Sequence, residues 1–172
     1  MRGSEKFASH VITEVVGREL VISYKEKKLK RIDEDDAEII ITVPTLKKLR
    51  FEGAGKTRID HIDNEDFYIS YEGAGMLVAS GKTKNLVVNA RGIGLVDTRN
   101  LIADQVNINV EGIGTVNVYA KEKLYASVQG IGNLNYYGRP KTVNKTVDGI
   151  GSIRAADYSQ ALIVLPAVRY WP

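Results

Sequence analysis

The stretch Val110-Glu111-Gly112-Ile113-Gly114-Thr115-Val116 contains a Gly-x-Gly triplet of a kind that occurs six times in the chain. The first glycines of successive triplets are 20, 19, 20, 18 and 19 residues apart. The triplet glycines are Gly53, Gly55, Gly73, Gly75, Gly92, Gly94, Gly112, Gly114, Gly130, Gly132, Gly149 and Gly151. A fixed period near 19 residues is typical of a solenoid, in which each repeat forms one coil stacked on the previous coil.

Apolar residues alternate with polar residues through each repeat. In the fourth repeat Val106, Ile108 and Val110 precede the triplet at every second position, and Val116 follows it. This is the period of a β-strand with one buried face. We therefore expect an all-β, parallel β-helix-like solenoid with coils of about 19 residues. The glycines would form its corners, because glycine adopts positive φ without a steric cost.

Two columns next to the glycines carry further expectations. The middle residue of the last four triplets is isoleucine, and we expect it to stack inward, so that Ile113 would be buried. The residue before each triplet should face solvent, either as a structural column or as part of a ligand face. These residues are Glu52, Glu72, Arg91, Glu111, Gln129 and Asp148.

The segments that flank the repeats differ from them. Residues 1–10 are expected to be a leader or expression-derived segment, because they begin Met-Arg-Gly-Ser. Residues 11–157 are expected to form one domain, with repeats from about residue 46 and earlier strands at 20–24 and 38–43, joined by a charged turn at 25–36. Residues 158–172 (YSQALIVLPAVRYWP) are predicted to be an apolar tail or cap.

The composition excludes several function classes. The formal net charge is only +3, which does not favour binding to nucleic acid, and the chain has no cysteine for a disulfide or a thiolate site. No apolar run approaches the roughly 20 residues needed to cross a bilayer. None of the triplets extends into a nucleotide-binding fingerprint. We predict no cofactor.

Few residues are candidates for chemistry. His61 lies between Asp60 and Asp63, and these three residues are weak candidates for an acid–base pair or a metal site. The alternative is a charged loop within one coil. Tyr119, Tyr125 and Tyr137 would form a possible ligand face if they point to the same side, since tyrosine rings stack on sugars.

The chain also resembles a known family, the head GIN domain, which is described as an auto-transporter adhesin and as a domain of unknown function. The resemblance rests on the repeated Gly-Ile-Gly and Glu-Gly-Ala-Gly units, on residues 20–24 and 41–46 before them, and on 143–153 (VNKTVDGIGSI) at the end. It implies a right-handed parallel β-helix-like fold, exported in bacteria and tethered to the envelope. The family's leading β-segments are expected to be missing here, and 158–172 does not match a family ending.

Three functions follow as hypotheses. The first is a non-catalytic module of the bacterial envelope or cell surface for adhesion or scaffolding. The second is a hydrolase or metal-dependent enzyme, with its site around Asp60, His61 and Asp63 or at a subunit interface. The third is a carbohydrate-binding module. The expected partners are a second copy of the chain, through the solenoid ends and 158–172, and a surface glycan or protein.

Overall fold

The computed structural model describes residues 5–25 and 38–157 and divides the chain into two compact units, Met1–Pro44 and Thr45–Pro172. Each unit is described here by itself. The predicted tail 158–172 lies outside the described residues, as does nearly all of the predicted charged turn.

The first unit contains a short helix and a β-hairpin. Helix α1 (Glu5–His10) leads into strand β1 (Val11–Val16), which pairs with strand β2 (Glu19–Tyr24). The two strands are antiparallel, and their register runs from Val11 opposite Tyr24 to Val16 opposite Glu19. Two residues join them, and the first, Gly17, has a φ of +64°. Tight hairpin turns of this length favour glycine because they require positive φ.

The predicted strand at residues 38–43 is wrong. Only Glu38 makes a bridge, and residues 39–43 have no strand structure. Ile40, Ile41 and Val43 are exposed. A run of β-branched residues forms a strand only where a neighbouring strand supplies hydrogen bonds and a surface for packing. Among the described residues β2 pairs with β1, and residues 39–43 complete no strand.

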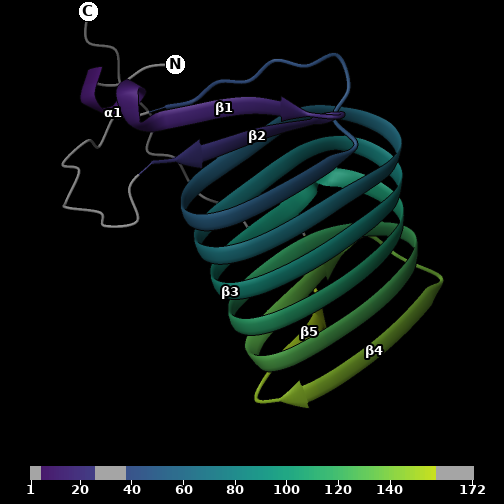
Figure 1. Ribbon diagram of the computed structural model, residues 1–172. Helices are drawn as coiled ribbons and strands as arrows, with labels where there is room; N and C mark the ends of the chain where they lie inside the picture. The colour runs from purple at the N-terminus through teal and green to yellow at the C-terminus, as the bar shows by residue number, and fades with distance from the viewer. Residues whose placement is uncertain (1–4, 26–37, 158–172) are drawn as a thin grey trace, which may run out of the picture. The chain divides into compact units, whose positions relative to one another are not determined.

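The second unit is built from parallel pairing between repeats. Strand β3 (Lys48–Tyr137) pairs with β4 (Thr142–Gly149) and β5 (Ser152–Ala155), both in parallel. Val128 lies opposite Val147 and Leu134 opposite Ile153, so the register equals one 19-residue repeat. In Figure 1 successive segments of β3 lie side by side. The described chain is therefore all-β apart from α1, as the sequence predicts.

The alternating apolar positions form the core of this unit, which confirms the predicted inward register in the second to fifth repeats. Ile108 and Val110 in the fourth repeat are almost fully buried, and Ile69, Val88 and Val128 hold corresponding places in other repeats. The core is weaker at its end, because Val147 of β4 is exposed.

The expectation that the triplet isoleucines are buried is wrong. Ile93, Ile113, Ile131 and Ile150 are 59%, 51%, 55% and 80% exposed. Strand alternation continues through the triplet, so the two glycines take the inward positions and the residue between them points outward. The glycines are needed there because the repeats approach closely: a Cβ on Gly92 would collide with the carbonyl oxygen of Gly73 in the repeat before it.

Candidate functional site

Four exposed isoleucines form the most regular apolar feature among the described residues. We call Ile93, Ile113, Ile131 and Ile150 the isoleucine ridge. Each occupies the middle of a Gly-x-Gly triplet in consecutive repeats. Neighbouring strands in a sheet lie about 4.8 Å apart, so the ridge presents apolar side chains at a nearly constant step. Repeated exposure of β-branched side chains on a rigid sheet indicates a contact surface.

A small hollow opens beside the first two isoleucines of the ridge. Its volume is about 20 Å³, enough for one water-sized group. Its lining comes from the triplet regions of the third and fourth repeats, including Ile93, Ile113 and Thr115, and from Tyr71. The Tyr71 side chain is stacked on Phe51 with a centroid distance of 5.4 Å and an interplanar angle of 6°.

The hydroxyl of Tyr71 has no hydrogen-bond partner. Tyr71 is only 3% exposed, and Oη is buried without a donor or an acceptor in contact. Burial raises the pKa of the Tyr71 phenol. Buried polar atoms without a partner are rare because each costs about 1–3 kcal/mol. This hydroxyl is therefore a costly exception in the packing of the core.

An ion pair borders the hollow. Arg91 Nε donates to Glu111 Oε2 at 2.9 Å, and Asn109 Nδ2 donates to Oε1 of the same carboxylate at 2.8 Å. The hydrogen bond from Arg91 is the main reason that the pKa of Glu111 lies below its ordinary value, and Asn109 adds to the effect. The charges of Arg91 and Glu111 are therefore engaged with each other. The residues that precede the triplets are mostly exposed, which confirms the prediction that this column faces solvent.

Neutral polar groups follow the ridge on its other flank. Thr115, Asn133 and Ser152 occupy the position two residues after the ridge isoleucine in three consecutive repeats. Ser152 Oγ donates to Asn133 Oδ1 at 2.9 Å. The last two ridge isoleucines therefore lie between two polar columns. One column holds Asn133 and Ser152, and the other holds Gln129 and Asp148.

The predicted acid–base group near His61 is held in other interactions. Asp60 accepts hydrogen bonds from Arg58 Nε and Ser80 Oγ, each at 2.7 Å. These two contacts, led by Arg58, lower the pKa of Asp60, which makes the carboxylate a weaker base. Asp63 lies 3.7 Å from Lys82 Nζ. No group of three or more acidic or histidine side chains in residues 5–25 and 38–157 could hold a metal ion.

The three predicted ligand-face tyrosines have different environments. Tyr125 is exposed and Tyr119 is half-buried, whereas Tyr137 is buried, with the Arg99 guanidinium 5.8 Å from its ring centroid. Tyr119 lines a separate surface depression with Lys121 and Arg139. The structure does not bring the three rings together in one exposed group.

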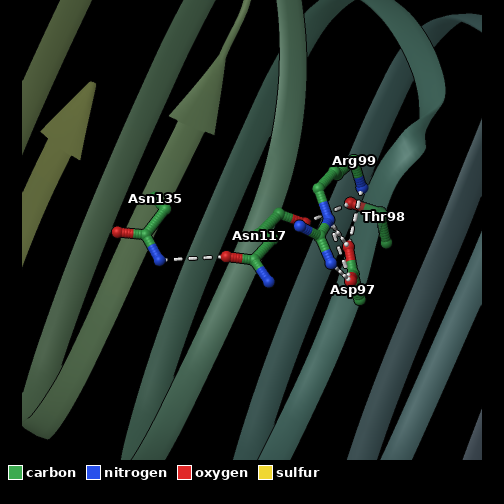
Figure 2. A network of polar contacts seen from close by, with 5 residues as sticks. All are labelled: Asp97, Thr98, Arg99, Asn117 and Asn135. Carbon is green, nitrogen blue, oxygen red and sulfur yellow. Dashed lines mark hydrogen bonds and ion pairs between the residues drawn. The ribbon is translucent and has the colours of Figure 1, made fainter. Parts of the chain in front are cut away.

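A polar network that sequence reasoning missed lies five residues after the first triplet glycine (Figure 2). Asn135 Nδ2 donates to Asn117 Oδ1 at 3.0 Å, and Thr98 Oγ1 donates to the Asn117 carbonyl at 3.0 Å. Arg99 Nε lies 3.0 Å from both carboxylate oxygens of Asp97. These groups bond to one another, so the network is structural. The sequence signal for this network is the recurrence of Asp97, Asn117 and Asn135 at one position in three consecutive repeats.

The comparisons with known proteins agree with the repeat pattern. The family described as "Putative auto-transporter adhesin, head GIN domain" matches residues 1–140. The chain belongs to this family. The match covers most of the GIN domain described above, including the first five triplets and three of the four ridge isoleucines.

One solved structure is similar to this GIN domain. It is the crystal structure of a "putative adhesin" from Bacteroides fragilis NCTC 9343, with a TM-score of 0.66 and 21% sequence identity. The alignment covers 88% of the GIN domain chain and 79% of the other chain. At this identity the likeness shows the fold alone. No curated protein matches the chain. No helix in the described part of the GIN domain has the length and apolar character needed to cross a membrane.

Proposed function

We propose that this GIN domain is a non-catalytic module of the bacterial envelope or cell surface, and that the isoleucine ridge is its adhesive surface. The observation that carries the proposal is the exposure of four isoleucines in consecutive triplets. The family description as an adhesin supports a surface role. The hydrogen bonds that hold Asp60 give no support to the enzyme hypothesis.

We further propose that the second unit is a right-handed parallel β-helix. The one-repeat register of β4 and β5 against β3 supports the parallel coils, as do hydrogen bonds between side chains 19 and 20 positions apart. The right hand is what the family resemblance implies. Such a scaffold would suit adhesion, because every repeat presents the same position to solvent on rigid backbone.

Adhesion can be measured by displaying the full chain on a non-adherent bacterial host and counting cells retained under flow. Targets would be other bacterial cells and polymer-coated glass. The test variant is Ile93→Ser/Ile113→Ser/Ile131→Ser, and the matched control is Ile102→Ser, which removes an exposed isoleucine outside the ridge. Wild type and control should be retained several-fold above the empty host, and the triple variant should not. Equal retention of all displayed variants, or none above the host, would contradict the proposal.

We also propose that the domain self-associates through its end. Within the described strands β4 pairs only with β3, and Val147 and Ile150 at this end are exposed. An unpaired strand edge with apolar side chains is a template for further pairing. Light scattering at high micromolar concentration should give a mass above that of one chain. A Val147→Lys variant should shift the mass towards 19.0 kDa. A wild type that is already monomeric would refute this proposal.

A further inference from the structure

We propose that Lys145 is a built-in stop at the β4 end of the repeat stack, and that it prevents a second copy from continuing the stack in the same register. Contacts between copies would then be limited to the part of the β4 edge near Val147 and Ile150. The inference goes beyond the self-association proposed above, because it names a residue that restricts how two copies can meet.

Lys145 occupies a position that is apolar in every earlier repeat. The position lies four residues before the first triplet glycine, and in the first five repeats it holds Leu49, Ile69, Val88, Ile108 and Ala126. Strand β4 pairs with β3 so that Lys145 lies opposite Ala126, which is buried (Figure 1). A charged residue therefore stands at the end of an otherwise apolar core column.

The Lys145 ammonium covers an aromatic ring at this end of the core. Its Nζ lies 4.6 Å from the centroid of the Tyr136 ring, and Tyr136 is a half-buried residue that packs against the core. A cation at this distance from a ring face is attracted to it. Because Lys145 is itself exposed, the charge stays in water while the side chain lies over the ring.

Lys145 also occupies a backbone hydrogen-bonding group at the edge of β5. Its Nζ donates to the carbonyl oxygen of Ile153 at 3.4 Å. Ala156 N donates to the carbonyl oxygen of Tyr136 in β3, so the backbone groups of Ala156 face β3. Backbone groups of successive residues in a strand face opposite sides, and Ile153 therefore turns its carbonyl away from β3. Lys145 thus holds a carbonyl that a following coil would need for pairing.

A second copy that continued the stack would have to bury this charge. In the same register, the residue next to Lys145 would be Leu49 in the first repeat of that copy. The ammonium would lose water and gain no carboxylate there, and an unpaired charge is costly to bury. Charged side chains that point inward at a sheet edge are one of the means by which proteins prevent strand addition.

The remainder of the β4 edge allows a different contact. Val147 is 44% exposed, and Ile150, just after the strand, is 80% exposed. Two copies that meet through this patch can bury both side chains and leave Lys145 in water. A contact made by the same patch on both copies closes at two subunits, whereas a head-to-tail contact repeats into a filament. The stop therefore favours a closed pair over a fibre.

Sedimentation velocity of the full chain over a range of concentrations tests the inference, with thioflavin T fluorescence to detect fibres. Lys145→Leu restores the apolar column and should produce species larger than a dimer, with fluorescence several-fold above that of wild type. Lys141→Leu is the matched control, because it makes the same change just before β4, and it should behave as wild type. Lys145→Arg keeps the charge and should also behave as wild type. Circular dichroism checks that each variant is folded, and Lys145→Met is a second apolar variant.

The outcomes separate this inference from the proposed self-association. A monomeric wild type with growth of Lys145→Leu would refute self-association and support the stop. A wild-type dimer with no further growth of folded Lys145→Leu and Lys145→Met would overturn the stop and leave self-association standing. Open-ended growth of the wild type would also overturn the stop, as would equal growth of Lys141→Leu and Lys145→Leu.

Discussion

Gly73 packs so closely against Gly53 that a Cβ on Gly73 would collide with the carbonyl group and the amide nitrogen of Gly53. A Cβ on Gly53 meets nothing within 4 Å, since no repeat precedes it among the described residues of the second unit. The two glycines stand at the same place in successive repeats. A side chain is therefore excluded by contact at Gly73 and not at Gly53, and the difference arises only from the repeat that lies next to Gly73.

Substitution of these two glycines should separate stacking from backbone strain. Gly53→Ala should cost about 1–3 kcal/mol of unfolding free energy, because alanine is strained at a φ of +132°. Gly73→Ala adds a collision with backbone and should cost more than about 4 kcal/mol. Urea denaturation followed by circular dichroism measures both. Equal costs would mean that the repeats are not in the close contact described.

Tyr71→Phe should not destabilise the domain, although Tyr71 is buried. The substitution removes only an unpaired hydroxyl. The free energy of unfolding should therefore stay the same or rise by up to about 1 kcal/mol, and the melting temperature should not fall. Tyr71→Ala is the contrasting variant and should cost about 3–5 kcal/mol through loss of the ring stacked on Phe51. A large loss of stability in Tyr71→Phe would show that Oη has a partner.

Two isoleucines five residues apart should respond in opposite ways to a carboxylate. Ile113→Asp changes an exposed side chain and should cost about 1 kcal/mol or less, mostly through the poor strand propensity of aspartate. Ile108→Asp buries an unpaired charge in the core and should prevent stable folding. Thermal melts of both variants would decide between the outward ridge and an inward isoleucine column.

His61 has a φ of +63°, a conformation that non-glycine residues seldom adopt. His61→Gly should therefore keep or raise the unfolding free energy, by up to about 1 kcal/mol, since glycine meets no Cβ penalty there. His61→Val should lower it, because a β-branched side chain is more strongly strained at positive φ. Chemical denaturation compares the two. A destabilised glycine variant would indicate that the imidazole makes a stabilising contact.

The rim of the hollow should show a pH dependence that Arg91 controls. The folded-state pKa of Glu111 is lowered, chiefly by Arg91, so the contribution of the pair is present above the ordinary carboxyl pKa and is lost as pH falls through the folded pKa. Titration by NMR should place the pKa of Glu111 below the ordinary value of a glutamate. Arg91→Gln should move it upward, and Lys121→Gln is a control that should not. An unchanged Glu111 pKa in Arg91→Gln would exclude the ion pair in solution.

The sequence by itself determined the all-β class, the repeat length and the buried columns. Ile69, Val88 and Ile108 recur at one position in the repeat, four residues before the first triplet glycine. The alternation of apolar and polar residues around them leaves only one face for the core. The family resemblance was also legible, because the triplets stand at regular spacing. These properties follow from local alternation and counting, which need no knowledge of neighbours in space.

Only the tertiary structure decided the positions that matter for the candidate site. Apolar character alone predicted an inward Ile113, whereas the close approach of successive backbones reserves the inward places for glycine and turns the isoleucine out. The same limit applies to residues 38–43, where propensity favoured a strand that no partner completes. The unpaired Tyr71 hydroxyl likewise depends on what the next two repeats place around it, and that arrangement arises from packing between residues about 20 and 40 positions apart.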